Sequence, residues 1–214
     1  MNKKLLNYSD YLNLKQLLDS QKPKSGQNGE PAHDEMLFII THQVYELWFK
    51  QIVHELDSIL DIFNNEVVEE SGVSSAVLKL VRIIEIQKLL IDQVSVLETM
   101  TAMDFLEFRD YLFPASGFQS SQFRLIENKL GLAAENRINY GREDYKSTIK
   151  KEEKIKIQRS EKEKSLFNLL EIWLERTPFL SFDGFDFWEQ YSIAVKSMLD
   201  KEENIIRNNP NYNK

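Results

Sequence analysis

The chain contains three histidines, and they differ in their surroundings. His42 lies in the middle of a predicted helix between aromatic residues, where an imidazole either satisfies a hydrogen bond inside the fold or faces a ligand. We expect His33, beside a predicted helix start, and His54, among polar neighbours, to be solvated. The chain has no HExxH pair and no cysteine, so neither a paired-histidine zinc site nor a thiolate ligand to zinc or haem is expected.

Arg109 is the second candidate, because it interrupts an aromatic run that includes Phe105. A guanidinium binds a carboxylate through two parallel hydrogen bonds and suits a half-apolar pocket. The alternative is an ion pair at the surface with Asp110 or Glu107, and the residues alone favour neither reading. The adjacent segment PASGFQS offers two hydroxyls and a flexible backbone, which is also what an ordinary turn contains.

The elements that must position these residues are long helices. Thirteen Phe and eight Tyr, against only seven Gly and five Pro, describe large packing units with few breaks. With 214 residues, of which 42% are hydrophobic, we expect one all-α domain over residues 1–214. Within it, residues 1–33 form an N-terminal arm and a linker, and residues 34–214 form a bundle of long helices.

Apolar spacing and capping residues predict the individual helices. Ser74 or Ser75 is expected to cap the second long helix, Thr101 with Asp104 the third, and Ser160 with Glu163 a later one. The predicted helical segments are 7–19, 34 to about 63, 74 or 75 to about 97, 102 to about 112, 122–131, 160 to about 178 and 186 to about 208. Residues 20–33 are expected to be a mobile connector, 135–156 mainly loop, and the charged run at 150–164 a solvated face.

Charge and hydropathy exclude several classes of protein. The net charge of −7 and a pI near 5.2 provide no positive field for a phosphate backbone, so we expect no nucleic-acid partner. No segment approaches the roughly 18 uncharged apolar residues of a membrane span, and the N-terminus does not resemble an export signal. These features predict a soluble cytoplasmic protein, which the absence of cysteine also fits.

Two long segments carry a resemblance to a known family. DEMLFIITHQVYELWFKQIVHEL, at positions 34–56, resembles the signature helix of the tryptophan 2,3-dioxygenases, and VLETMTAMDFLEFRDYLFPASGFQSSQFRLIENKLG, from Val96 to Gly131, resembles the second block of that family. YLNLKQLL and LLEIWLERTP match further segments, so the resemblance spans almost the whole chain.

The resemblance implies an all-α subunit of a homotetramer that contains haem b and oxidises L-tryptophan with O2 to N-formylkynurenine, the first step of the kynurenine pathway. By position, His42 would be the distal histidine that binds the indole nitrogen. Phe38 would pack on the indole ring, and Arg109 would bind the substrate carboxylate. Ser116, with Gly117, would lie beside the haem.

The resemblance also gives the arm a role. Tyr8, Tyr11 and Leu12, which by themselves indicate only a docking contact, would complete the substrate pocket of a neighbouring subunit. Phe105 stands where some members carry tyrosine, so one hydroxyl contact to the substrate carboxylate would be missing.

The family pattern continues with a helix that carries the proximal haem histidine and with a GTGGSSG-like loop. Neither motif occurs in the 214 residues, and none of the three histidines matches the proximal position. The axial ligand is therefore expected beyond Lys214, and no metal ligand is expected within this chain. Two alternatives stay open at this point: a non-catalytic helical binding or assembly module that has lost haem, and a related haem enzyme that acts on another indole.

Overall fold

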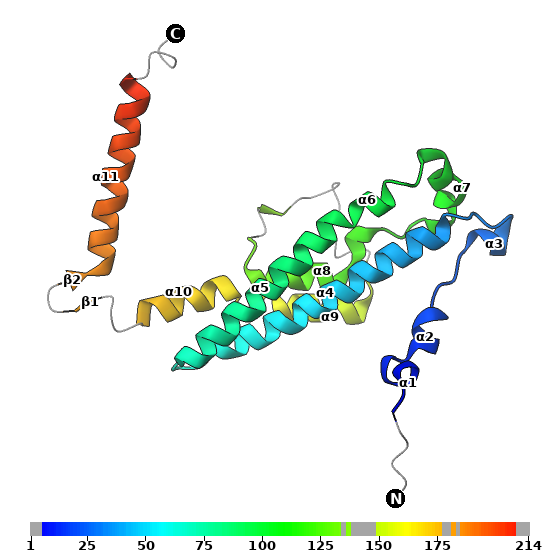
Figure 1. Cartoon of the computed structure of the whole chain (residues 1–214), viewed down its shortest axis with the longest axis horizontal. Helices are drawn as coiled ribbons and strands as arrows, with labels where there is room; N and C mark the ends of the chain where they lie inside the picture. The colour runs from blue at the N-terminus through cyan, green and yellow to red at the C-terminus, as the bar shows by residue number, and fades with distance from the viewer. Residues whose placement is uncertain (1–5, 134–135, 138–148, 177–180, 183–184, 209–214) are drawn as a thin grey trace, which may run out of the picture. The chain divides into compact units, whose positions relative to one another are not determined.

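The computed structural model describes residues 6–133, 136–137, 149–176, 181–182 and 185–208, and these residues are almost entirely helical (Figure 1). The helices are α1 (Tyr8–Leu12), α2 (Leu14–Leu18), α3 (Ser25–Asn28), α4 (Glu35–Phe63), α5 (Glu70–Asp92), α6 (Val94–Leu97), α7 (Ala102–Leu112), the 3-10 turn η1 (Gly117–Gln119), α8 (Ser121–Leu130), α9 (Lys151–Ser160), α10 (Leu166–Arg176) and α11 (Phe187–Asn208). Two short antiparallel strands, β1 (Ser181–Phe182) and β2 (Phe185–Asp186), form a hairpin. The all-α prediction is confirmed.

The chain divides into two units, residues 1–166 and residues 167–214. The first unit holds α1 to α9. The second holds nearly all of α10, the hairpin and α11. The expectation of one domain over residues 1–214 stays a prediction.

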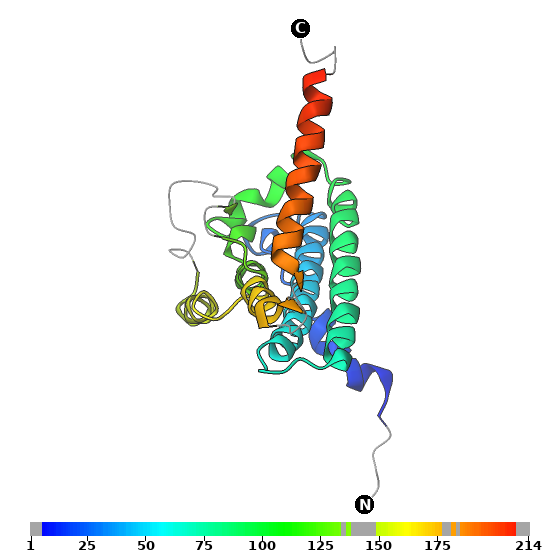
Figure 2. The ribbon, with the colours of Figure 1, turned by 90° about the vertical axis from the view of Figure 1, so that its left-hand side faces the viewer.

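Helix α4 is the centre of the first unit and lies between α5 and α8, while α9 packs on α8 (Figures 1 and 2). Polar contacts fix the direction of α5 on α4. Arg82 pairs with Glu55, the Tyr45 hydroxyl donates to the Leu90 carbonyl, and Gln93 donates to the carbonyl of Thr41. Because positions in α5 rise as positions in α4 fall, the two helices are antiparallel, as predicted.

The core of the first unit gathers around the second half of α4. Leu56 and Ile59 are fully buried, and removing each such side chain from water contributes about 1.5–3 kcal/mol. The other buried apolar side chains of the helices in this unit are Ile52 and Phe63 of α4, Ala76, Ile83, Ile86 and Leu90 of α5, Phe108 of α7, Ile126 of α8 and Ile157 of α9. The first half of α4, which carries His42, is only partly covered.

Two predicted helix starts were wrong. Helix α5 begins at Glu70, not at Ser74 or Ser75, and a Cβ at Gly72 would come within 3.2 Å of the Ile62 side chain. Close packing against the end of α4 thus extends the helix toward its N-terminus. Ser160 ends α9 instead of capping the next helix, because its hydroxyl accepts a hydrogen bond from Asn128 and donates to the Ile157 carbonyl.

Residues 20–33 were expected to be mobile, and the structure places them against the first unit instead. Ser25 is fully buried, and its hydroxyl accepts a hydrogen bond from the Ala32 amide. Two further contacts, with Glu35 and with Gln43, hold the segment on α4. The connector is therefore an ordered strap, although its composition is that of a linker.

Several large apolar side chains of the helices are exposed in the single chain. On α4 these are Met36, Ile40 and Leu47, at 40%, 43% and 49% of their surface, and on α11 they include Tyr191 and Met198, both at 53%. The charged run at 150–164, expected to be solvated, contains the fully buried Ile157. Among the described residues, no helix has the length and hydropathy needed to cross a membrane.

Candidate functional site

One face of α4 carries the residues on which the site is built. Phe38, His42 and Glu46 follow one another at intervals of four residues, and Tyr45 and Phe49 do the same beside them. On a helix, this spacing places side chains above one another on one face. The face is continuous because the α4 sequence contains no Gly or Pro.

Two cavities open along this face and share four residues, His42, Glu46, Gly117 and Ser120. The first, which we call the aromatic cavity, has a volume of about 390 Å³. Its remaining wall consists of Tyr45, Phe49, Leu97, Phe118 and Phe123. The second, which we call the polar cavity, measures about 470 Å³. Its remaining wall consists of Phe38, Ile39, Gln43, Leu112, Ala115, Ser116, Gln119, Ser121 and Glu153.

The His42 ring is held in one orientation by its own helix. Its Nδ1 lies 2.7 Å from the carbonyl oxygen of Phe38, and its ring centroid lies 4.1 Å from that of Phe38. A carbonyl oxygen only accepts hydrogen bonds, so Nδ1 must carry the proton. In the neutral imidazole, Nε2 is then an acceptor, and it has no hydrogen-bond partner among the described residues. The ring thus offers one bare nitrogen to a donor from a ligand.

Tyr45 and Glu46 are polar side chains of the walls that already have partners. The Tyr45 hydroxyl donates to the Leu90 carbonyl at 2.7 Å, and burial raises the pKa of this phenol. Gln122 donates to both the backbone carbonyl and the carboxylate of Glu46, at 2.7 and 2.8 Å. These bonds tie α5 and α8 to α4 at the level of the cavities.

The loop between α7 and α8 supplies the cavity edge opposite α4. Its conformation is set locally: the Ser116 hydroxyl accepts from the Phe118 amide, the Gln119 side chain accepts from the Ser116 amide, and Ser120 caps α8 by accepting from the Phe123 amide. A Cβ at Gly117 would meet no atom within 4 Å, so the backbone there opens directly on the cavities. The Phe113–Pro114 peptide bond of this loop is cis.

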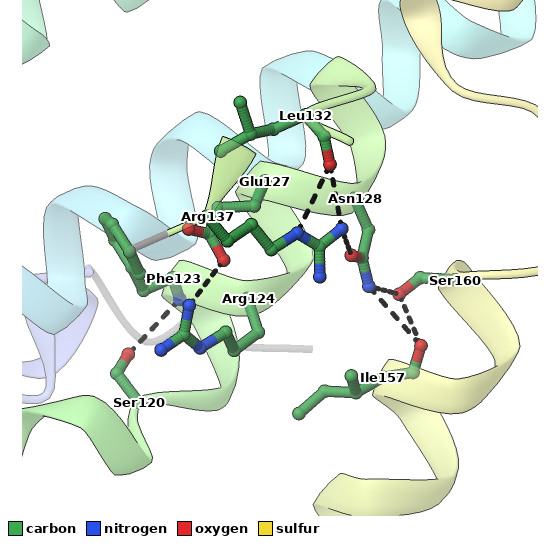
Figure 3. A network of polar contacts seen from close by, with 9 residues as sticks. All are labelled: Ser120, Phe123, Arg124, Glu127, Asn128, Leu132, Arg137, Ile157 and Ser160. Carbon is green, nitrogen blue, oxygen red and sulfur yellow. Dashed lines mark hydrogen bonds and ion pairs between the residues drawn. The ribbon is translucent and has the colours of Figure 1, made fainter. Parts of the chain in front are cut away.

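Helix α8, which carries Phe123 into the aromatic cavity, is held from behind by a buried polar network (Figure 3). Arg124 and Glu127, both buried, form an ion pair at 2.7 Å. Asn128 donates to the Ser160 hydroxyl of α9 at 2.7 Å and accepts from Arg137 at 2.7 Å. The network fixes α8 between α4 and α9.

Of the predicted substrate residues, the structure brings together Phe38, Phe105 and His42, but not Arg109. The Phe105 ring lies 5.7 Å from the Phe38 ring. Arg109 is exposed on α7, lines neither cavity and forms no ion pair among the described residues. Its neighbour one turn later, Leu112, does line the polar cavity.

The remaining predicted residues divide in the same way. Ser116 and Gly117 line the polar cavity, and Gly117 lines the aromatic cavity as well. Tyr8, Tyr11 and Leu12 lie in the arm with 74%, 72% and 41% of their surface exposed, and they line neither cavity.

Most residues of the cavity wall were not predicted as site residues from the sequence. Tyr45, Glu46 and Phe49 were detectable, because each lies three, four or seven residues after His42 and therefore on its face of α4. Phe118 and Phe123 were not, because Phe118 lies in the loop before α8 and Phe123 lies in α8, and no periodicity relates either segment to α4.

The chain's other histidines contribute nothing to these cavities. His33 and His54 are exposed, as predicted, and neither lines a wall. Within the part of the chain that the structure describes, no group of three or more His, Cys, Asp or Glu side chains has the arrangement of a metal site.

A helical body with a histidine between an aromatic and a polar cavity has the geometry of the class of proteins with a concave pocket for a small organic molecule. Comparison with known proteins narrows the class. The family model for tryptophan 2,3-dioxygenase matches residues 1–213, and the chain belongs to this family.

Three curated relatives, each called tryptophan 2,3-dioxygenase, illustrate the similarity. The protein of Bdellovibrio bacteriovorus is 50% identical over 205 residues, which are 96% of this chain and 57% of the relative. Those of Dictyostelium discoideum and Xenopus laevis are 50% identical over 202 and 204 residues, which are 94% and 95% of this chain and 50% of each relative. The chain therefore spans about half the length of the curated relatives that it matches.

Proposed function

We propose that this protein is a haem-dependent dioxygenase that converts L-tryptophan and O2 to N-formylkynurenine in the cytoplasm. The observation that carries the proposal is the state of His42. Its Nδ1–H donates a hydrogen bond to the Phe38 carbonyl, so the Nε2 lone pair can accept a hydrogen bond from a ligand in the cavities. The N–H of an indole is such a donor.

The aromatic cavity suits one face of a haem. Its apolar wall is built largely from aromatic rings, among them Phe49, Phe118 and Phe123, and Gly117 leaves open space at its edge. These residues would hold the distal face, with Ser116 beside it, and haem iron would supply the chemistry by which O2 reacts with the indole.

The polar cavity suits an amino acid. We assign the indole to the side of Phe38 and His42, where a ring packs on the benzyl group and its N–H donates to Nε2. His42 then orients the substrate.

We assign the substrate carboxylate to Arg109. The residues Phe105, Arg109 and Leu112 lie on one face of α7 by their spacing. Phe105 packs on Phe38, and Leu112 lines the polar cavity, so this face of α7 borders the proposed substrate position. The guanidinium has no competing ion pair among the described residues, which leaves it available to a carboxylate.

We also propose a homotetramer in which the arm of one subunit completes the pocket of its neighbour. Tyr8 and Tyr11 are apolar enough to favour burial, yet 74% and 72% of their surfaces are exposed in the single chain. Such exposure in two aromatic side chains three residues apart indicates a face that another surface covers.

The test is anaerobic reconstitution of the protein, produced from its complete reading frame, with ferrous haem, followed by tryptophan and O2. We expect a Soret band, a change of that band with tryptophan, and absorbance of N-formylkynurenine after O2. His42→Ala is expected to keep the Soret band and to change the response to tryptophan. A protein that binds haem but gives no N-formylkynurenine from tryptophan would refute the proposed reaction.

A further inference from the structure

The described part of the chain contains one carboxylate that is fully buried, outside both cavities and not used by the proposed reaction. This is Glu35, the first residue of α4, with none of its surface exposed. Its carboxylate points to the connector. Oε1 accepts from the Lys24 amide at 2.6 Å, and Oε2 accepts from the Ser25 amide at 2.9 Å and from the Ser25 hydroxyl at 2.6 Å.

These three bonds satisfy a charge that burial alone would make costly. Burial acts to raise the pKa of Glu35, but the hydrogen bonds from the backbone and hydroxyl groups outweigh it and hold the pKa below its ordinary value. The Ser25 hydroxyl also accepts a hydrogen bond from the Ala32 amide. This bond joins the two ends of the segment from Ser25 to Ala32 and closes it into a compact turn. We call this arrangement of Glu35, Lys24 and Ser25 the clasp.

A second contact shows where the clasp places the chain. Gln21, four residues before Ser25, donates to the Gln43 side chain at 2.6 Å, and Gln43 lines the polar cavity next to His42. The connector thus runs along α4 from Gln43 to Glu35, a distance of about 12 Å for eight helical residues. The arm leaves the body of the subunit at Gln21, at the edge of the polar cavity.

The connector also meets α7. A Cβ at Gly29 would lie 3.3 Å from the Tyr111 hydroxyl, so the connector passes close to the helix that carries Arg109. Helix α4 therefore presents, within its first three turns, the clasp at Glu35, the aromatic ring of Phe38 and the imidazole of His42.

We propose that Glu35 is a positioning residue, which fixes the point at which the arm leaves the subunit and thereby sets the reach of Tyr8 and Tyr11 toward a neighbouring pocket. The reach of the arm rests on the proposed function, whereas the clasp itself does not. Without the clasp, the point at which the arm leaves the subunit shifts toward the start of α4. The length of the free arm then varies from one molecule to the next.

Limited proteolysis tests the clasp in the full chain. Trypsin does not cleave the Lys22–Pro23 bond, so the Lys24–Ser25 bond is the tryptic site inside the clasp, and Lys15 in the exposed α2 is an internal reference. For Glu35→Gln, which turns an acceptor into a donor facing amide groups, we expect cleavage after Lys24 to rise by on the order of 10- to 100-fold relative to Lys15. Glu30→Gln, an exposed carboxylate in the same connector, is the matched control and is expected to match the wild type.

Spin labels test the position of the arm. Because the chain has no cysteine, Lys15→Cys in α2 and Gln87→Cys in α5 give two unique labels on exposed positions, diluted with unlabelled chain. We expect a narrow distance distribution in the parent and in Glu30→Gln, and a broad one in Glu35→Gln. If Glu35→Gln fails to fold, Ser25→Ala removes only the hydroxyl bonds and is expected to give a smaller effect in the same direction.

An unchanged cleavage rate or an unchanged distance distribution in a folded clasp variant would overturn the proposal. In the haem-loaded enzyme, we expect Glu35→Gln to raise KM for tryptophan while kcat changes less than about twofold, because the arm borders substrate and the reacting groups stay in place. If the arm is released in Glu35→Gln but KM for tryptophan does not change, Glu35 does not act as a positioning residue. If the wild type shows no activity at all, the proposed function fails, and the proteolysis and distance measurements still decide on the clasp.

Discussion

At the scale of single residues, the chemistry of the site depends on which nitrogen of His42 carries the proton. The bond from Nδ1 to the Phe38 carbonyl is made within one helix, between residues four positions apart, so it does not require a ligand or a partner chain. The tautomer is therefore set before substrate arrives, which is the state that a preorganised acceptor requires.

We predict that 15N NMR of histidine-labelled protein at neutral pH shows His42 as the Nδ1–H tautomer. Its Nε2 is expected to shift when tryptophan binds, because it then accepts a hydrogen bond. His33 and His54, both exposed, serve as internal controls and are expected to exchange between tautomers. An Nε2–H tautomer for His42 would contradict the geometry from which the function is inferred.

Arg109→Leu is predicted to weaken tryptophan binding to the haem-loaded enzyme by about 1.5–3 kcal/mol, the usual contribution of a hydrogen bond to a charged group. Calorimetric titration measures it directly. Lys88→Leu, on the exposed surface of α5, is the control and is expected to leave the affinity unchanged. Because Arg109 is exposed in the single chain, an unchanged dissociation constant for Arg109→Leu would assign it to the surface.

At the scale of elements, buried polar groups hold the connector and the helices around α8 in place. These contacts cannot be predicted from amino-acid composition. Residues 20–33 have the content of a flexible linker, yet Glu35 anchors them. Ser160 and Glu163 have the spacing of a capping box, yet Asn128, 32 residues earlier in the chain, binds the Ser160 hydroxyl. Local sequence patterns predicted the helices, because periodicity and capping depend on residues close together in the chain. The same patterns did not predict these contacts, because tertiary packing brings the partners together.

The same reasoning applies to the candidate site. His42 and Phe38 were predictable since both lie on one helix, at a spacing that guarantees contact. The position of Arg109 relative to them depends on how α7 meets α4, and no periodicity in either segment encodes that angle. Only the resemblance to the family predicts that Arg109 and His42 share a pocket, and Arg109 lines neither cavity in the single chain.

The clasp makes stability depend on pH, with a sign that follows from Glu35. Its pKa is lower in the folded chain than the ordinary value of 4.5, so the charged form is favoured by folding. The contribution to the free energy of unfolding is complete above pH 4.5 and is lost as the pH falls through the lowered pKa. Urea unfolding at pH 7, 5 and 3.5 is expected to show a difference between wild type and Glu35→Gln that shrinks toward pH 3.5. A difference that is constant over this range would show that the charge of Glu35 does not contribute.

Asn128→Ala is predicted to lower the free energy of unfolding by about 1–3 kcal/mol, because Ser160 and Arg137 lose a buried partner between α8 and α9. Chemical denaturation measures the change, and Gln87→Ala, an exposed substitution on α5, is expected to stay within about 0.5 kcal/mol of the wild type. Equal effects of the two substitutions would mean that the network in Figure 3 does not stabilise the contact between these helices.

At the scale of the whole molecule, a single chain leaves two features of the site incomplete. The cavities lie along the first half of α4, which is less covered than the second half, and the arm that leaves the subunit beside them has its aromatic side chains exposed. One chain thus presents both an open pocket and an arm whose aromatic side chains are exposed. An assembly in which each arm covers the pocket of a neighbour would bury both at once.

Subunit mixing separates this shared pocket from an arm that serves only for assembly. Deletion of residues 1–18 removes α1 and α2 but leaves the clasp, so we expect the free energy of unfolding to change by less than about 1 kcal/mol, because these helices contain no buried residue. Activity of the haem-loaded protein is expected to fall by at least about tenfold, because the proposed pocket then lacks the wall that the arm supplies.

Arg109→Leu subunits, in contrast, keep the arm and lack the carboxylate partner. When the two impaired proteins are unfolded together and reassembled, an armless subunit with an intact Arg109 receives an arm from an Arg109→Leu neighbour, and the activity of the mixture should rise above that of either component. Each protein refolded alone is the control. If the mixture stays as inactive as its components, although mass spectrometry shows hybrid assemblies, the arm does not complete a neighbouring pocket.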